Sequence, residues 1–319
     1  MLRPGPKLTA SERTAAVSRL RVAAGKAAEL VAEASRLPGA ESATHGTTLV
    51  VDRAGVVRAN AAAMSMVLDD LGDDEASRLL AIAQAGGAKV TGAGAGLVLA
   101  VIGTAILGQY EPFTDRLLLS APTVEAVRAE IAAPPDDFAL WVCLHEQTHR
   151  HQFAAAPWMR DYMRGLVRSA VARDDDAPAG DETPVAGLGV VGLMADERLK
   201  AVIGQVTALM SLLEGYADML MDTSGAAVIA SLPSIRAQID QRRRTKKHDL
   251  MSILRRAFGF DAKIDQYVTG KSFCEAVSQK AGMDGLNVAF TSRDTLPTVD
   301  ELHHPDTWLA RCLPEAGGA

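Results

Sequence analysis

The feature that most constrains the fold of this chain is an apolar segment, FALWVCLHEQTHRHQF, at residues 138–153. Two prolines and two aspartates at positions 134–137 precede it directly, a combination typical of the first turn of a helix. We therefore predict a helix that starts there and ends before Pro157. Histidine and glutamate are costly to bury in such an apolar helix unless a partner such as a metal ion neutralises them.

The sequence HEQTH within this helix predicts a metal site. Residues four apart lie about 40° apart around a helix axis, so His145 and His149 project side by side and can bind one ion, while Glu146 is rotated by about 100°. Catalytic zinc takes three protein ligands and keeps one open position, where it acidifies water. The spacing thus predicts His145 and His149 as zinc ligands and Glu146 as a general base. A chance occurrence is the alternative, and the apolar surroundings argue against it.

A third ligand is expected from a separate helix. Glu214 lies in MSLLEGYADMLMD, residues 210–222, on the apolar face of a predicted helix, where an unpaired carboxylate is unfavourable. Asp218 follows one turn later and is predicted to accept a hydrogen bond from the far nitrogen of a ligand histidine. Glu197 and His151 are competing third ligands, although His151 is too close to the second histidine of the motif. The other interpretation is a carboxylate pair that faces a basic neighbour.

Composition favours a mainly helical protein with a small sheet. Of the 319 residues, 48% are hydrophobic but only 4% aromatic, which is typical of helices that pack through small side chains. Residues 8–37 have the spacing of an amphipathic helix, and residues 47–60 form two β-branched runs around Gly55, which predicts a hairpin. Residues 117–120 predict a third strand. The expected fold class is α+β, predominantly α-helical, with a small antiparallel sheet.

The remaining segments are predicted to be helices and one polar loop. Further helices are predicted at residues 61–71, 75–84 and 195–222. Residues 172–189, rich in acidic residues, proline and glycine, are predicted to form a mobile loop. Residues 235–260 predict a pair of basic helices with a solvated face. We expect an N-terminal region, 1–133, that holds the sheet and a metal-binding region, 134–319, in one continuous globular unit.

Charge and cysteine content argue against several classes of protein. The chain carries 33 basic and 39 acidic residues, a net charge of −6, so neither nucleic acid nor an anionic membrane is an expected partner. Its three cysteines are scattered, which predicts neither a disulfide framework nor a cysteine zinc site. The N-terminus lacks the apolar stretch of a secretory signal, so a cytoplasmic protein is expected. Residues 90–110 are uncharged, but their strongly apolar part is only roughly 14 residues long, which favours a buried helix over a membrane span.

HEQTH followed by EGYAD resembles the gluzincin branch of the zincin metallopeptidases, which pairs HExxH with a Glu-x-x-x-Asp on a later helix. The resemblance implies that His145, His149 and Glu214 are the zinc ligands. It also implies that Glu146 is the catalytic base and that Asp218 supports the site. The 64 residues between His149 and Glu214 exceed the usual interval of the best-known members, and this difference bears on the third ligand.

A second resemblance covers most of the chain. It rests on LGQYEPF at 107–113, the HEQTH segment, APW at 156–158, MSLLEGYADMLMD, AKIDQYVTGKSF at 262–273, and LPTVDEL. These phrases resemble a bacterial family of zincin-like hydrolases without an assigned substrate. Some of its members are labelled as associated with the biosynthesis of a deazaflavin coenzyme. The resemblance implies a zincin-like core around the HExxH helix and a metal-dependent hydrolase.

Together these features predict a hydrolase with one zinc ion per chain that cleaves peptide or amide bonds. Glu146 would activate water and pass its proton to the leaving nitrogen. Tyr216, Tyr267 and His248 are candidates for oxyanion or substrate contacts, and the strand at 117–120 would align an extended substrate by edge pairing. The alternatives are a non-catalytic, metal-stabilised scaffold or interaction protein and a narrow amidase acting on a cofactor precursor. A structural zinc site usually closes four protein ligands, so an open position would favour an enzyme.

Overall fold

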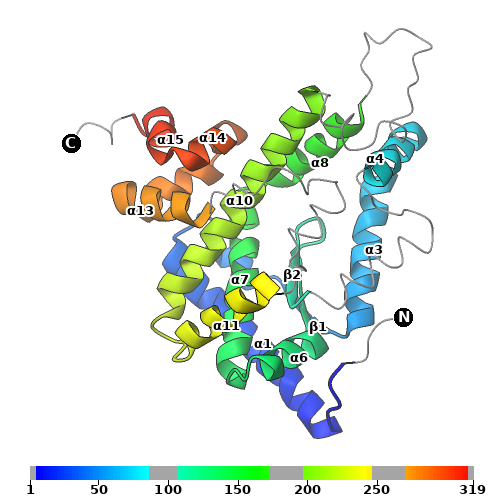
Figure 1. Ribbon diagram of the computed structural model, residues 1–319, viewed down its shortest axis with the longest axis vertical. Helices are drawn as coiled ribbons and strands as arrows, with labels where there is room; N and C mark the ends of the chain where they lie inside the picture. Colours follow the sequence, from blue (N-terminus) through cyan, green and yellow to red (C-terminus); the bar gives the residue numbers. More distant parts are fainter. Residues whose placement is uncertain (1–4, 86–105, 173–196, 246–269, 315–319) are drawn as a thin grey trace.

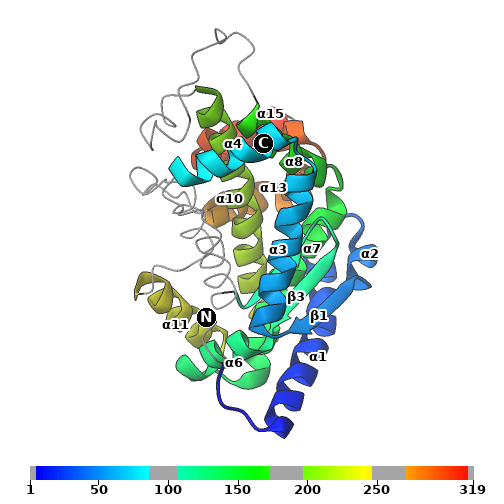
Figure 2. The same cartoon turned by 90° about the vertical axis from the view of Figure 1, so that its right-hand side faces the viewer.

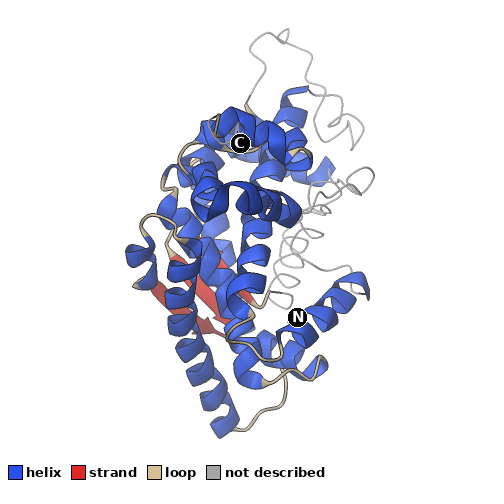
Figure 3. Ribbon diagram, turned by 90° about the vertical axis from the view of Figure 1, so that its left-hand side faces the viewer, coloured by secondary structure: helices blue, strands red, loops and turns tan. Residues whose placement is uncertain are grey.

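The computed structural model describes residues 5–85, 106–172, 197–245 and 270–314 (Figure 1). The longer helices are α1 (Ala10–Ser35), α3 (Arg53–Asp69), α4 (Asp73–Ala85), α6 (Ala121–Glu130), α7 (Pro135–Ala155), α8 (Trp158–Val171), α10 (Glu197–Gly225), α11 (Leu232–Thr245) and α13 (Gly270–Asn287). Three short helices are α2 (Ala40–Thr44), α14 (Val299–His303) and α15 (Pro305–Cys312). The strands are β1 (Thr47–Val51), β2 (Gly108–Glu111) and β3 (Arg116–Ser120). The fold is therefore α+β and predominantly helical, as predicted (Figure 3).

The sheet is mixed, which corrects the prediction of an antiparallel sheet. Its strand order is β1–β3–β2, with β1 parallel and β2 antiparallel to β3. The predicted hairpin over residues 47–60 is wrong in its second half, because Asp52 ends β1 and caps α3 by accepting a hydrogen bond from the N–H of Gly55 at 2.6 Å. The chain therefore leaves the sheet through α3 and returns to it later, and this crossover allows β1 and β3 to run in parallel.

The predicted strand at residues 117–120 is confirmed as β3, but it cannot align a substrate by edge pairing. It lies in the middle of the sheet, between β1 and β2, so both of its edges are occupied. A tight turn joins β2 to β3. There the Glu111 carboxylate accepts hydrogen bonds from the N–H groups of Phe113 at 3.0 Å and Thr114 at 2.8 Å. The strands that form the edges of this sheet are β1 and β2.

Helices cover both faces of the sheet. α3 lies over β1 and β3 on one face, and α1 and α7 lie on the other (Figures 1 and 2). α7 packs along α1, which presents small buried residues such as Ala24 and Ala27, and the Gln147 amide of α7 donates to the Ala24 carbonyl at 3.0 Å. α10 crosses α7 on its other side and in turn contacts α13. This arrangement places α7 between the sheet and α10.

The helix predictions are largely confirmed. The helix predicted after residue 134 is α7, and it ends before Pro157. The segments at 8–37, 75–84 and 195–222 correspond to α1, α4 and α10, and the one at 61–71 is the second half of α3. Most of the predicted loop at 172–189, of the apolar segment at 90–110 and of the second basic helix lies outside the described residues. Within the described residues, no helix is both long enough and apolar enough to cross a membrane. The division at residue 133 stays a prediction.

Candidate metal centre

Three predicted ligands converge between α7 and α10. Nε2 of His145 lies 3.1 Å from Nε2 of His149. The Glu214 carboxylate faces both rings, with one oxygen 3.4 Å from His145 Nε2 and the other 3.6 Å from His149 Nε2. All three ligand atoms lie within 4.8 Å of one another, close enough to bind a single ion. Two imidazole nitrogens and a carboxylate oxygen form a donor set that suits zinc, so the side chains present fit the predicted metal.

Glu146 lies beside this cluster and is held by the sheet. Its side chain is buried, and one carboxylate oxygen accepts a hydrogen bond from the backbone N–H of Tyr110 in β2 at 3.0 Å. Burial raises the pKa of Glu146 to about 7, against the opposing effects of the His145 charge and of this hydrogen bond. A carboxylate with a pKa near neutrality can both accept and donate a proton under ordinary conditions.

Gly108 in β2 makes room for this glutamate. A Cβ atom at residue 108 would lie 2.5 Å from Cγ of Glu146 and 2.9 Å from its Cδ, well inside van der Waals contact. Only glycine therefore allows the strand to approach α7 so closely. Gly108 and Tyr110 lie in the phrase LGQYEPF, but no local pattern there predicts their contact with Glu146.

The two histidines differ in their affinity for a proton. Burial by itself lowers the pKa of His145, but the hydrogen bond and charge of Glu214 outweigh it and raise that pKa to about 9. Burial lowers the pKa of His149, and the charge on His145 lowers it further. In the metal-free protein the His145–Glu214 pair therefore holds a proton while His149 stays neutral. A bound cation would take the place of that proton.

Asp218 lies one turn after Glu214, and its carboxylate contacts an arginine. Its Oδ1 accepts a hydrogen bond from Nη1 of Arg236 in α11 at 3.1 Å, and Arg236 also bonds Asp222 at 2.6 Å. Burial lowers the pKa of His149 and the hydrogen bond with Glu214 raises that of His145, and the negative charge of Asp218 favours the protonated form of both rings, so Asp218 lies close to them. Its predicted hydrogen bond to a histidine stays a prediction.

The far nitrogen of His149 has a partner, Gln152, that was not among the predicted site residues. Nδ1 of His149 lies 2.9 Å from Oε1 of Gln152, one turn later on α7. The amide nitrogen of Gln152 donates to the carbonyl of Leu213 at 3.0 Å, directly before Glu214 in α10. A glutamine three residues after a ligand histidine, in an apolar helix, was the available signal.

Those other candidate residues that the structure describes lie apart from the three-residue cluster. The Tyr216 side chain is buried, and its hydroxyl bonds the Ser35 carbonyl at 3.2 Å and Asn287 at 2.9 Å, which is the environment of a packing residue. Glu197 starts α10, about 25 Å along the helix from Glu214, and pairs with Lys200. His151 is buried, with Nδ1 facing the Gln147 carbonyl at 2.8 Å. Tyr267 and His248 lie outside the described residues.

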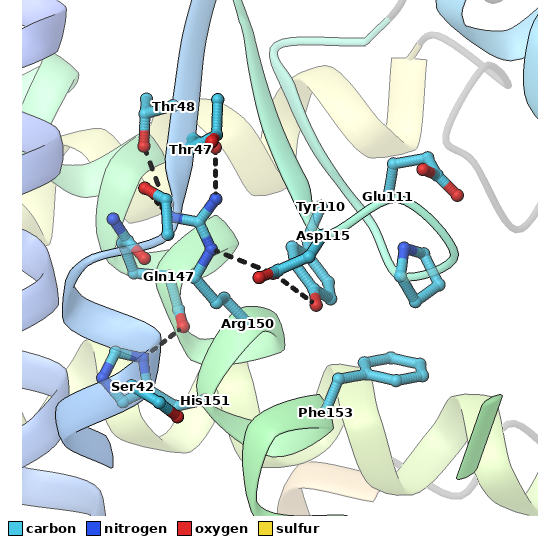
Figure 4. Close-up of polar contacts among 12 residues, drawn as sticks. Ser42, Thr47, Thr48, Tyr110, Glu111, Asp115, Gln147, Arg150, His151 and Phe153 are labelled. Atoms are coloured by element: carbon cyan, nitrogen blue, oxygen red, sulfur yellow. Dashed lines mark hydrogen bonds and ion pairs between the residues drawn. The ribbon is translucent and has the colours of Figure 1, made fainter. Parts of the chain in front are cut away.

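A buried arginine fixes α7 to the sheet (Figure 4). Arg150, only 1% exposed, donates to the carbonyls of Gly46, at 3.2 Å, and Thr47. Its Nε lies 3.7 Å from Asp115, which also accepts a hydrogen bond from the Tyr110 hydroxyl at 3.0 Å. Arg150 thereby connects α7 to β1 and to the β2–β3 hairpin. Its position directly after His149 gave no indication of this role.

Comparisons with known proteins agree with this geometry. A family described as zincin-like metallopeptidase matches residues 1–309 of the chain. Among solved structures, a protein from Chloroflexus aurantiacus described as a "putative hydrolase with a novel fold" is similar, with 25% sequence identity and a TM-score of 0.68. The match covers 96% of this chain and 92% of the other. The comparison with curated proteins gave no match.

Proposed function

The chain belongs to the zincin-like metallopeptidase family, and on that premise we propose that it is a zinc-dependent hydrolase that cleaves peptide or amide bonds. One observation carries the proposal. The side chains of His145, His149 and Glu214 meet around one point, and Glu146, with a pKa of about 7, lies beside them. Paired metal ligands next to a carboxylate of raised pKa form the arrangement that metal-assisted hydrolysis requires.

His145, His149 and Glu214 would hold the metal, each with one ligand atom. When bound, zinc acts there as a Lewis acid that polarises a carbonyl group and acidifies water. Within the described residues the cluster has three ligands, and a zinc site with three protein ligands is typical of enzymes, whereas a structural site usually closes four. The donor set therefore supports a catalytic over a purely structural role.

Glu146 supplies the acid–base chemistry. Its carboxylate takes a proton from the attacking water and then, as a neutral acid, gives it to the leaving nitrogen. The N–H of Tyr110 binds one carboxylate oxygen at 3.0 Å and leaves the other to receive that proton. Because burial raises the pKa of Glu146 to about 7, neither protonation state is strongly disfavoured near neutral pH.

The outer edge of β2 supports an extended substrate. The Ser120 N–H donates to the Leu107 carbonyl at 2.8 Å, and hydrogen-bonded pairs alternate along antiparallel strands, so Gly108 and Tyr110 direct their backbone groups away from β3. One of these groups, the N–H of Tyr110, already bonds Glu146. A peptide that paired with this edge would run past the base and the ligand cluster.

A cleavage assay tests the proposal. Wild type loaded with zinc is incubated with a peptide library and a panel of small amides, and products are identified by mass spectrometry with a chelator control. We expect cleavage that the chelator abolishes and that Glu146→Gln lowers by about 10²- to 10⁴-fold, since glutamine cannot take the proton. Glu125→Gln is the matched control, because Glu125 is equally buried but pairs with Arg19 away from the cluster. Wild type that cleaves nothing, or Glu146→Gln that cleaves normally with zinc bound, would contradict the proposal.

A further inference from the structure

Gln152 joins the two helices that carry the metal ligands. It lies one turn after His149 on α7, and its side chain is fully buried. Oε1 lies 2.9 Å from Nδ1 of His149, and Nε2 lies 3.0 Å from the carbonyl oxygen of Leu213 in α10. Leu213 directly precedes Glu214. One amide group therefore contacts a ligand of α7 and the backbone beside the ligand of α10.

The Leu213 contact decides where the protons lie. A carbonyl oxygen can only accept a hydrogen bond, so the group of Gln152 that faces Leu213 must be its NH₂. The amide oxygen then faces His149, and the Nδ1 of that ring must be the donor. In a neutral imidazole the other nitrogen carries the lone pair. His149 is thus held with the lone pair of Nε2 directed at His145 and Glu214, as a metal ligand requires.

We propose that Gln152 is a positioning residue of the metal centre, which fixes the tautomer of His149 and the spacing between its ring and Glu214. The inference rests on the proposed zinc site. Because Gln152 is fully buried, water does not replace either hydrogen bond when the amide is removed. Without this amide, His149 can adopt the tautomer with its proton on Nε2. That proton must be lost before a metal binds.

Two variants separate the two hydrogen bonds. Gln152→Met keeps the length of the side chain and removes both bonds. Gln152→Glu, in its ionised form, keeps an acceptor for Nδ1 of His149 but cannot donate to the Leu213 carbonyl. We expect zinc affinity, measured by competition with a chromophoric chelator, to fall by about 10- to 100-fold in Gln152→Met. Gln152→Glu should lose less, because it retains the bond that sets the tautomer.

A second readout does not depend on metal. In the metal-free protein, the ¹⁵N shifts of the His149 ring report which nitrogen carries the proton when the ring is neutral. Wild type and Gln152→Glu should have the proton on Nδ1. Gln152→Met should show a mixture of the two tautomers or a change to Nε2, which a simple loss of packing would not produce.

Gln147 provides a matched control on the same helix. It is also a buried glutamine, and its Nε2 donates to the Ala24 carbonyl of α1 at 3.0 Å, away from the ligands. Gln147→Met should destabilise the metal-free protein to a similar degree as Gln152→Met. Its zinc affinity should stay within about threefold of wild type, since it supports no ligand.

The outcomes distinguish this inference from the proposed function. If Gln152→Met binds zinc as tightly as Gln147→Met and leaves the His149 tautomer unchanged, the inference is overturned while the zinc site stands. If wild type binds no zinc, the proposed function fails, and the ¹⁵N shifts still decide whether Gln152 sets the tautomer. If Gln152→Met does not fold, Gln152→Glu carries the test. A zinc affinity of Gln152→Glu equal to that of wild type would then show that the hydrogen bond to Leu213 does not contribute.

Discussion

The backbone N–H of Tyr110 donates a hydrogen bond to the Glu146 carboxylate across 3.0 Å, so an edge strand of the sheet holds the glutamate that the HEQTH helix presents. The two residues are 36 positions apart in sequence. This contact requires β2 to lie against α7, which in turn depends on the missing side chain of Gly108 and on the Arg150 contacts that fix α7 to the sheet. The candidate active site is therefore made by the sheet and the two ligand helices together.

Replacing Gly108 by alanine should impair the base without removing the metal. The added Cβ would lie 2.5 Å from Cγ of Glu146, so either β2 or the glutamate must move. Because a misplacement of about 1 Å costs about 10²-fold in rate, we expect a loss of that order with unchanged zinc content. The measurement is steady-state hydrolysis beside elemental analysis. Gly165→Ala, where a Cβ meets nothing within 4 Å, is the control, and equal kinetics for the two variants would refute the packing argument.

Zinc binding should release about one proton at neutral pH. Glu214 raises the pKa of His145 to about 9, so the ring is protonated below that pH and the metal must displace its proton. Zinc affinity should therefore rise as the pH increases and level off above about 9. Calorimetric titrations in buffers of different ionisation enthalpy measure the released proton. A wild type whose affinity did not change with pH would contradict this interpretation.

Glu301 should stabilise the C-terminal helices at neutral pH but not in acid. Burial by itself raises the pKa of Glu301, but its hydrogen bonds with Arg311 and the Thr298 N–H outweigh it and lower that pKa. A lowered pKa in the folded state gives a stabilisation that is present above the unfolded value of about 4.3 and is lost as the pH falls through the folded value. In urea unfolding, Glu301→Gln should have a lower free energy of unfolding than wild type at neutral pH, with a smaller difference in acid. Asp300→Asn, at a neighbour whose side chain is 80% exposed, is the control, and an equal loss of stability in the two variants would contradict this role of Glu301.

Replacing Arg150 by methionine should weaken the fold and spare the ligands. The substitution leaves the carbonyls of Gly46 and Thr47 without their buried donor, and each such loss costs about 1–3 kcal/mol. We expect the free energy of unfolding to fall by at least about 2 kcal/mol, while zinc still binds to the folded fraction. Arg168→Met, at a residue whose side chain is 55% exposed, should change stability by less than about 0.5 kcal/mol. Equal effects of the two substitutions would mean that Arg150 does not fix α7 to the sheet.

Local signals in the sequence predicted α7 and the convergence of its ligands with Glu214. The helix start at Pro135 and the i, i+4 spacing of His145 and His149 are encoded within a few residues, so no tertiary information was needed. Glu214 was identifiable because a carboxylate on an apolar helical face needs a partner. These features predict which residues would bind the metal but not what surrounds them.

The surroundings of the site depend on contacts between distant segments. β1 pairs in parallel with β3, with Thr47 opposite Arg116, and no local pattern encodes that register. The β-branched residues after Asp52 suggested a second strand, whereas the cap that Asp52 provides started a helix. The Gln152 amide contacts the Leu213 carbonyl, and the Glu146 carboxylate contacts the Tyr110 N–H. Both contacts use a backbone group, and such groups have no sequence signature.

The most direct test of the account is the position of zinc in a crystal of the protein, located by anomalous scattering collected above and below the zinc absorption edge. We predict one peak per chain, with a Glu214 oxygen and the Nε2 atoms of His145 and His149 each about 2.0 to 2.2 Å away. Glu146 should lie beside the ion without binding it. A peak elsewhere, or a Glu214 carboxylate turned away from the two histidines, would contradict the assignment of these three residues as the metal centre.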